Sequence, residues 1–345
     1  MKMTYYRILF AGFLCCLLVV FGHSKQGNAQ ATTSTEMGYH IYAILPENQQ
    51  NPDNSFFDLR MIPGQEQTIE VAIVNVSSQE QTFTLEINQA YTNEQGFIDY
   101  SDKQRTQETN KQLTIDQIAT YKKIVTIQKQ HTEKVPITLK MPKEAYAGEL
   151  LAGIKVSKLE KQLNQEGITN TYSYLLGLRL TENDQIVQRK IGLKKIEPTI
   201  AFGKASIAIN LINPVREAYG HLTYHVEVRE AETGKLINQK DYTELQLAPV
   251  STYHFSIDWD DEHLVAGNYK LKLIITDKKE NSWTYHRKFS ISPNAAEQVN
   301  TMVAENKQFP YVSLLLGAIL LMLTVLSMFL IKKKWLVVNQ NRKNL

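Results

Sequence analysis

The sequence predicts an all-β ectodomain made of two immunoglobulin-like β-sandwich domains, with an N-terminal signal peptide and one C-terminal transmembrane helix. Three observations support this prediction. Apolar and polar residues alternate in short runs on both sides of residue 195, which places one set of side chains in a core and the other in solvent. Turn-forming residues separate these runs at the spacing of antiparallel sandwiches. A single long uncharged apolar run lies near the C-terminus.

The apolar run covers residues 312–331 and is followed directly by Lys332-Lys333-Lys334. About 20 residues in a helix rise about 30 Å, enough to cross the hydrocarbon core of a bilayer. Lysines that flank a span stay on the cytoplasmic side. We therefore expect a polar linker at 293–310, a transmembrane helix at 311–331 and a cytoplasmic tail at 332–345. A helix buried in a protein core is the competing interpretation.

The N-terminal 31 residues have the pattern of an export signal. Lys2 and Arg7 precede an apolar stretch at 8–21, and Ala29-Gln30-Ala31 matches a small-x-small cleavage site. A retained N-terminal anchor is the alternative. Both cysteines of the chain lie inside this segment, so the expected mature protein has neither disulfides nor thiol chemistry. The expected location is the cell membrane, with a single pass and the ectodomain outside, in the zone of the cell wall.

The first predicted domain covers residues 36–194. Ile69, Val71 and Ile73 alternate with polar or small residues, as do the apolar residues of 82–87 and 134–141. Such alternation is typical of strands with one buried face. A polar stretch from Ser101 to Lys123 interrupts the pattern, and three apolar residues there are expected to anchor a short helix or a strapped loop: Leu113, Ile115 and Ile118.

The second predicted domain covers residues 196–292, after a boundary at Lys194–Pro198. The alternating pattern restarts there, and about seven strands fit into about 95 residues, which favours a compact sandwich. The junction around Glu197-Pro198 is short. Domains joined in this way usually fold and bind separately, so we expect the two sandwiches to act independently.

No constellation in the sequence predicts catalysis, a metal or a cofactor. His221 and His225 are four apart on a strand, about 13 Å, which is too far for both to bind one zinc ion. The acidic residues between Asp258 and Glu262 lack the glycine-punctuated spacing of a calcium loop. A net charge of +3 without long basic clusters outside the tail gives no reason to expect nucleic acid as a partner. We expect a chain that is not an enzyme.

Several short motifs, in order, resemble the WxL-interacting protein family of Gram-positive cell surfaces. Those of the first half are Phe57-Asp58-Leu59, Pro63-Gly64-Gln65, residues 74–77 and 90–101, Met141-Pro142-Lys143 and residues 150–154. Those of the second half are Asn213-Pro214, Leu247-Ala248-Pro249, residues 264–269 and Trp283. None of the three tryptophans is followed by x-Leu, so the chain is not itself a WxL protein. The segment 145–148 also replaces the Phe-Asp-Gly that is frequent in the family.

The resemblance implies a membrane-anchored adaptor without enzymatic activity. Its first domain is expected to bind peptidoglycan, and its second to bind WxL-domain surface proteins and so hold them at the cell wall. An adhesin that binds host extracellular matrix proteins is the alternative function.

Two sets of residues are candidates for interaction sites. The first lies in the segment from Thr92 to Tyr100, where Asp99 and the Tyr100 ring are suited to a sugar; the alternative is a purely structural turn. Its candidates are Thr92, Asn93, Gly96, Asp99 and Tyr100. The second is a strand face or edge that could accept a partner strand, with His254 and Asp258 tuning specificity. Its candidates are Tyr253, Phe255, Ile257 and Trp259.

Overall fold

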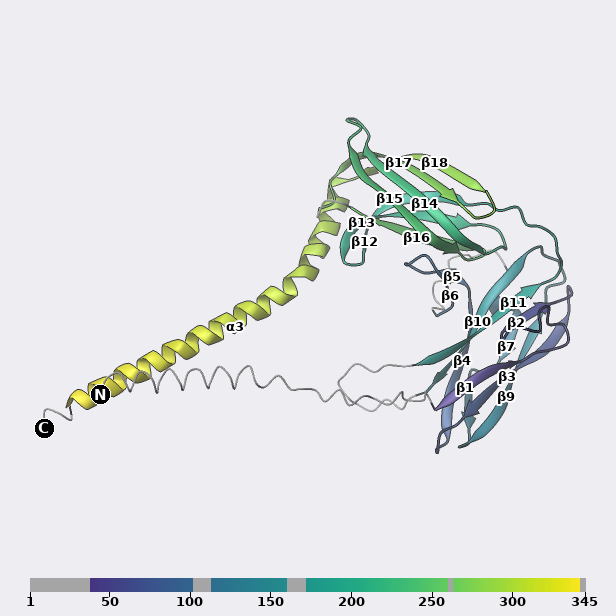
Figure 1. Cartoon of the computed structure of the whole chain (residues 1–345), viewed down its shortest axis with the longest axis horizontal. Helices are drawn as coiled ribbons and strands as arrows, with labels where there is room; N and C mark the ends of the chain where they lie inside the picture. Colours follow the sequence, from purple (N-terminus) through teal and green to yellow (C-terminus); the bar gives the residue numbers. More distant parts are fainter. Residues whose placement is uncertain (1–37, 102–112, 160–171, 260–262, 342–345) are drawn as a thin grey trace.

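The computed structural model describes residues 38–101, 113–159, 172–259 and 263–341. Two β-sandwiches follow each other along the chain, and a long helix, α3 (Pro293–Asn341), extends away from the second one (Figure 1). The all-β prediction is confirmed for the two domains. The predicted signal peptide at 1–31 lies outside the described residues, as do residues 260–262 of the acidic cluster and the end of the tail.

The first sandwich packs a four-stranded sheet against a five-stranded one. The four-stranded sheet has the order β1-β3-β9-β7: β1 (Tyr39–Ile44), β3 (Glu66–Asn75), β9 (His131–Lys140) and β7 (Ala119–Tyr121). The five-stranded sheet has the order β2-β11-β10-β4-β8: β2 (Phe57–Arg60), β11 (Ser173–Thr181), β10 (Glu149–Lys158), β4 (Gln81–Gln89) and β8 (Ile124–Ile127). Neighbouring strands are antiparallel except β2 and β11, which run parallel.

The core of the first sandwich follows the predicted alternation. Ile69, Val71 and Ile73 point inward from β3 and are almost completely buried. The polar stretch after Ser101 is anchored as predicted, because Ile115 and Ile118 of the short helix α2 (Ile115–Ile118) are buried in this core. The apolar residues within this polar stretch therefore correctly predicted where the segment is anchored to the core.

The second sandwich packs a three-stranded sheet against a four-stranded one. The three-stranded sheet has the order β12-β13-β16: β12 (Gly192–Ala201), β13 (Lys204–Asn213) and β16 (Ser251–Asp258). The four-stranded sheet has the order β15-β14-β17-β18: β15 (Leu236–Leu247), β14 (Tyr219–Glu230), β17 (Gly267–Thr276) and β18 (Ser282–Ile291). Every strand pair in this domain is antiparallel.

The predicted domain boundary at 194–196 is corrected by β12. This strand begins at Gly192 and pairs with β13 along its whole length, so residue 195 lies inside the second domain. Ile191, one residue earlier, is already buried in the second core. The connection between the domains is therefore the segment after β11, residues 182–190, and the charged pattern at Lys194–Glu197 belongs to the partly exposed face of a strand.

The predicted linker at 293–310 is corrected by the start of α3. Ala296, Val299 and Val303 pack into the core of the second sandwich. These positions follow the i, i+3, i+7 spacing of one helix face, which a mostly polar composition conceals. The Asn300 side chain on the same helix bonds to the backbone of Leu264: its Oδ1 accepts from the Leu264 amide at 2.8 Å, and its Nδ2 donates to the Leu264 carbonyl at 2.9 Å. The first turns of α3 are thus part of the domain. Within the described residues, no helix is both long and apolar enough to cross a membrane.

Candidate functional site between the two domains

A small hairpin leaves the first sandwich and reaches the second. Its strands are β5 (Tyr91–Thr92) and β6 (Ile98–Asp99), joined by a turn in which the Gly96 amide donates to the Asn93 carbonyl at 3.0 Å. The Asn93 side-chain oxygen accepts from the amides of Gln95 and Phe97, at 3.1 and 3.0 Å. The Asn93 side chain therefore stabilises the turn, because it accepts hydrogen bonds from backbone amides that a tight loop leaves without a backbone partner.

Asp99 closes the base of this hairpin. One carboxylate oxygen accepts from the amides of Tyr100 and Ser101, at 2.6 and 2.9 Å, and the other accepts from Asn93 Nδ2 at 3.3 Å. Partial burial opposes ionisation, but the hydrogen bonds from Ser101, Asn93 and Tyr100 outweigh it and lower the pKa of Asp99. The carboxylate is thus ionised at neutral pH and occupied within the hairpin.

Tyr100 lies on the first sandwich and not in the turn. Its side chain packs directly on Gly153 of β10, where an added Cβ would lie 2.6 Å from the Tyr100 Cβ. Burial raises the pKa of Tyr100 to about 12, with smaller contributions from the nearby carboxylates of Glu149 and Asp99. The alternative of a structural turn thus accounts for the contacts of Asp99 and Tyr100, and sugar binding at this hairpin stays a prediction.

Three hydrogen bonds fasten the hairpin to the second domain. The Gln246 amide donates to the Gly96 carbonyl at 2.7 Å, and the Ile98 amide donates to the Gln246 side chain at 2.9 Å. The Ala248 amide donates to Thr92 Oγ1 at 2.9 Å in a buried contact. Gly96 has φ +83°, and a Cβ at that position would lie 2.5 Å from Leu245 Cδ2. Glycine is favoured there by the backbone angle, and the tip of the Leu245 side chain would have to move to admit a Cβ.

A second set of contacts joins the domains at Gly148 and Glu149. The Glu149 amide donates to the Arg216 carbonyl at 2.7 Å, and Glu149 Oε1 accepts from the Ala218 amide at 2.8 Å. The Arg216 guanidinium lies over the ring of Tyr146, 5.1 Å from its centroid. These contacts correct the expectation of independent sandwiches. The connection at residues 182–190 is short, but loops distant in sequence extend the interface.

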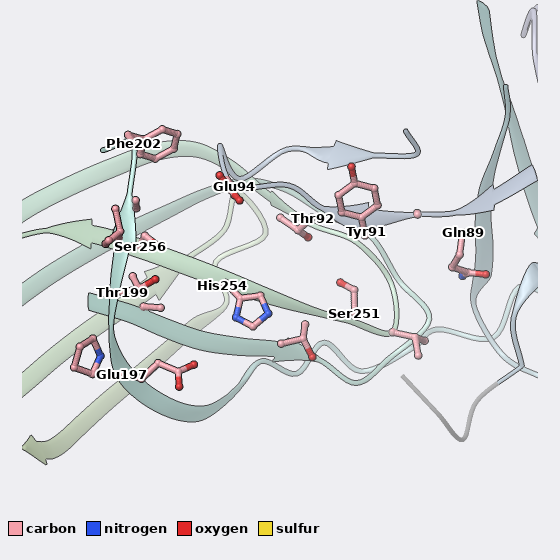
Figure 2. Close-up of a pocket in the computed structure, with 17 residues that line it drawn as sticks. Gln89, Tyr91, Thr92, Glu94, Glu197, Thr199, Phe202, Ser251, His254 and Ser256 are labelled. Carbon is pink, nitrogen blue, oxygen red and sulfur yellow. The ribbon is translucent and has the colours of Figure 1, made fainter. Parts of the chain in front are cut away.

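A groove of about 390 Å³ lies between the hairpin and the outer face of the β12-β13-β16 sheet. Figure 2 shows Tyr91 and Thr92 from the hairpin on one side and Glu197, Thr199 and His254 from the sheet on the other. Ala208 from β13 is buried at the floor. The groove is therefore built jointly by both domains.

A chain of hydrogen bonds crosses the sheet beneath this groove. Asn210 Nδ2 donates to Glu197 at 2.7 Å, and the Asn210 side-chain oxygen contacts Nδ1 of His254. The hydrogen bond from Lys195 is the largest cause of the lowered pKa of Glu197, and that from Asn210 adds to it, against a partial effect of burial. A carboxylate, an imidazole and the hydroxyls of Thr199, Thr252 and Ser256 therefore face the groove. Such a surface suits hydrogen bonding to a polar, extended ligand.

The predicted partner-strand residues need a correction in orientation. Tyr253, Phe255, Ile257 and Trp259 are at most 5% exposed and belong to the core of the second sandwich. Their burial follows from the alternation along β16, which places the polar set, including His254 and Ser256, on the groove side. β16 is nonetheless an edge strand of its sheet, with β5 beside it. A partner strand could therefore pair with the edge of β16 but could not contact its buried apolar face.

The residues first considered for metals have other contacts. His221 contacts Glu244, His225 contacts Asp241, and Asp258 pairs with Lys204 at 3.2 Å. In the parts of the chain that the structure describes, no group of three or more His, Cys, Asp and Glu side chains is arranged to hold a metal ion.

Comparison with protein families assigns both halves of the chain. Residues 39–158 match the model described as WxL Interacting Protein, peptidoglycan binding domain. Residues 163–301 match that described as WxL Interacting Protein, host binding domain. The chain belongs to the WxL-interacting protein family. Within this family member, the second match starts before β11, which the structure nevertheless places in the first sandwich next to β10. The two family domains are thus interlocked by one strand as well as by the hairpin.

Two comparisons with solved structures return fimbrial chaperones. The class 5 fimbriae chaperone CfaA is 11% identical, with a TM-score of 0.29, over 72% of this chain and 98% of that chain. The E. coli chaperone DraB is 13% identical, with a TM-score of 0.28, over 74% and 97%. These scores are too low to add to the description of the fold. A search of curated proteins returned no match.

The interface beside the groove contains residues that the sequence analysis did not bring together. Gln246 and Arg216 were not singled out, because their roles depend on loops that meet only in the fold. The polar residues of the β16 face were visible as the outward set of an alternating strand, and His254 was among those considered. The signal that locates the groove was therefore the set of polar residues that alternates with the buried residues along β16.

Proposed function

We propose that this family member is a cell-surface adaptor without enzymatic activity, which binds peptidoglycan and holds WxL-type surface proteins at the wall. The observation that carries the proposal is the pair of family matches, one described as peptidoglycan binding and the other as host binding, on a single chain. The hydrogen-bonded interface supports an adaptor in which two binding domains are held in a fixed relation. The groove has polar groups for recognition.

Peptidoglycan binding is tested by sedimentation. The full chain in neutral detergent is expected to pellet with purified, insoluble peptidoglycan and to be released by an excess of soluble peptidoglycan fragments. The sizes of the fragments should be unchanged after long incubation, since an adaptor breaks no bonds. A chain that stays in the supernatant would contradict wall binding, and shortened fragments would contradict the absence of catalysis.

The groove is the surface that we assign to the WxL-type partner. A partner strand laid beside β16 would gain main-chain hydrogen bonds from a sheet edge, and the groove side chains would select its sequence. The hairpin covers the start of β16 near Ser251, because Thr92 bonds to Ala248 and Gly96 approaches Tyr253. The later part of β16, from His254, is therefore the part offered to a partner.

Filling the groove is expected to block this contact. Ser256→Arg projects a long cation from β16 into the groove, and we expect at least ten-fold weaker binding of a purified WxL-domain protein by calorimetry. The matched control is Thr276→Arg, an exposed position on the opposite sheet. Equal affinity of both variants and the parent chain would remove the groove from the partner site.

Membrane anchoring is part of the same proposal. Its support is the uncharged run at 312–331 and the three lysines that follow it. Membranes extracted at alkaline pH should retain the full chain; its release into the extract would refute the anchor.

Binding to a host ligand is the second candidate function. It is favoured by the description of the family model that matches residues 163–301. An adhesin and an adaptor share this architecture, and the chemistry of the outer surface of the second domain separates them.

A further inference from the structure

The outer face of the β14-β17-β18 sheet carries a concentrated positive charge. Arg229, Lys270, Lys272 and Lys288 line one shallow hollow of about 350 Å³, together with His286 and a single carboxylate, Glu227. We call these six residues the basic face. The sheet is the layer of the second domain that lies farther from the first (Figure 1). The basic face is therefore separate from the groove between the domains.

The register of the strands places like charges directly opposite each other. Lys270 on β17 faces Lys288 on β18 and Arg229 on β14. In the first domain, by contrast, Lys140 lies opposite Glu66, and Lys155 lies opposite Glu86. Like charges in directly opposite positions destabilise a sheet. The row of Arg229, Lys270 and Lys288 thus places three cations side by side, whereas Lys272 lies opposite Glu227.

The acids near the basic face do not neutralise it. Glu227 pairs with Arg229 and lies directly opposite Lys272, so this single carboxylate offsets only one of the four cations. Among the described residues, none of the three lysines has a carboxylate within salt-bridge distance. Glu232 lines the adjoining hollow with Lys270 and Lys288 without pairing with either. Lysines on an edge strand protect against aggregation, which accounts for Lys288 on β18. It does not account for cations on β17 and β14, which are interior strands of this sheet.

We propose that the basic face binds a linear sulfated polysaccharide. The cations are spaced by about 5 Å across strands and about 7 Å along them, so that consecutive anionic groups of one extended polymer can each meet a charge. The outward residues of β17 and β18 add the hydroxyls of Thr284 and Ser290, which suit a sugar. The residues Trp283, Tyr285 and Phe289 of β18 pack against the core and belong to the inward set.

The absence of aromatic residues among the outward positions of β17 and β18 decides between polymers. Single-stranded nucleic acid is held by bases stacked on aromatic rings, and membrane surfaces by apolar side chains that insert. The outward positions of β17 and β18 carry no aromatic side chain, and their one large apolar side chain is Ile274. The choice of a host polysaccharide over a phosphate-bearing wall polymer rests on the proposed host binding of this domain.

Binding to heparin tests the proposal with the full chain in neutral detergent. The triple variant Lys270→Gln, Lys272→Gln, Lys288→Gln should fold, because these side chains point outward, and bind immobilised heparin at least ten-fold more weakly. The slope of log affinity against log salt should fall by about two to three, roughly one for each lysine removed. The matched control changes three exposed lysines of the first domain to Gln, Lys123, Lys134 and Lys140, and should keep the affinity of the parent chain.

Competing polymers separate the sources of negative charge. Chemically desulfated heparin should compete at least ten-fold less well than heparin, and so should inorganic polyphosphate, single-stranded DNA and vesicles rich in anionic lipid. If any of these binds as tightly as heparin, or if the triple variant and the control are equal, the proposal is overturned. Sedimentation of the triple variant with peptidoglycan should be unchanged. Failure of the basic face is therefore distinguishable from failure of the wall-binding function.

Discussion

Replacing Gly148 by alanine is expected to separate the two domains and to lower the free energy of unfolding by about 3 kcal/mol. Gly148 has φ +86°, and a Cβ there would lie 2.1 Å from the backbone oxygen of Arg216. A backbone atom cannot swing aside as a side chain can, so the interface must open. The strained angle costs about 1 kcal/mol, and the two lost hydrogen bonds of Glu149 cost about 1 kcal/mol each.

The matched control for this prediction is Gly203→Ala. Gly203 also has a positive φ, +73°, but a Cβ there has no atom within 4 Å. Its cost is the backbone angle alone, about 1 kcal/mol. Urea unfolding gives the two free energies, and hydrogen exchange of the Glu149 and Ala218 amides reports whether the interface has opened. Equal unfolding free energies, with both amides still protected in Gly148→Ala, would mean that the interface is not as close as described.

The prediction also bears on the groove. If the hairpin and the Gly148 loop hold the domains together, a variant that opens the interface also widens the groove that both domains build. We therefore expect Gly148→Ala to lose affinity for a WxL-type partner although it changes no groove residue. A fixed arrangement of two binding domains is the property that distinguishes this chain from two domains on a flexible linker.

Local patterns predicted the strands well because each depends on neighbours in sequence. The alternation at Ile69, Val71 and Ile73 identified a buried strand face, and Ile115 and Ile118 identified the anchor in a polar stretch. The same alternation was interpreted wrongly at β16. Phe255 and Ile257 were considered as a partner face, although an apolar alternating set in a sandwich is the set that forms the core.

The interface was beyond prediction because its parts are far apart in sequence. Thr92 meets Ala248 across more than 150 residues, and Gly148 meets Arg216 across almost 70. The residues around Gly96 were recognised as a well-specified turn, but nothing local indicates that this turn packs against Leu245 of the other domain. Similarly, the helical spacing of Ala296, Val299 and Val303 was hidden in a segment of polar composition. Contacts of this kind follow from topology and not from composition.

Replacing Arg189 by methionine is expected to destabilise the second domain by about 3 kcal/mol. Arg189 lies in the connection between the domains, donates to Glu217 at 2.8 Å and to Asp277 at 2.5 Å, and covers the ring of Tyr219. Its side chain is 11% exposed, and that of Asp277 is fully shielded from solvent. Removing one partner of a buried pair costs about 3–5 kcal/mol, because the other charge stays buried. The lower end applies here, since Asp277 keeps its hydrogen bonds from Asn281.

The pH dependence of this loss distinguishes a charge effect from a packing effect. In the parent chain burial raises the pKa of Asp277, but hydrogen bonds from Asn281, Arg189 and Lys279 outweigh it, so the pKa lies below its usual 3.8. A lowered folded pKa means that this stabilisation is present above pH 3.8 and is lost only as pH falls through the folded pKa. Without Arg189, burial weighs more and the pKa of Asp277 rises. The carboxyl then takes up a proton on acidification, and the stability gap between variant and parent should narrow from pH 7 to about pH 4.

Thermal or urea unfolding at pH 7 and pH 4 measures this gap. Arg287→Met is the matched control, because Arg287 lies exposed on β18 and makes no salt bridge among the described residues. We expect the control to lose less than about 0.5 kcal/mol at either pH. A gap for Arg189→Met that is as large at pH 4 as at pH 7 would assign the loss to packing on Tyr219. A loss of stability for Arg189→Met no larger than that of the control would mean that the Arg189–Asp277 pair does not stabilise the connection between the domains. A pH-dependent gap instead means that the buried charge of Asp277 fixes the chain where it enters the second sandwich, directly before β12, which lines the groove.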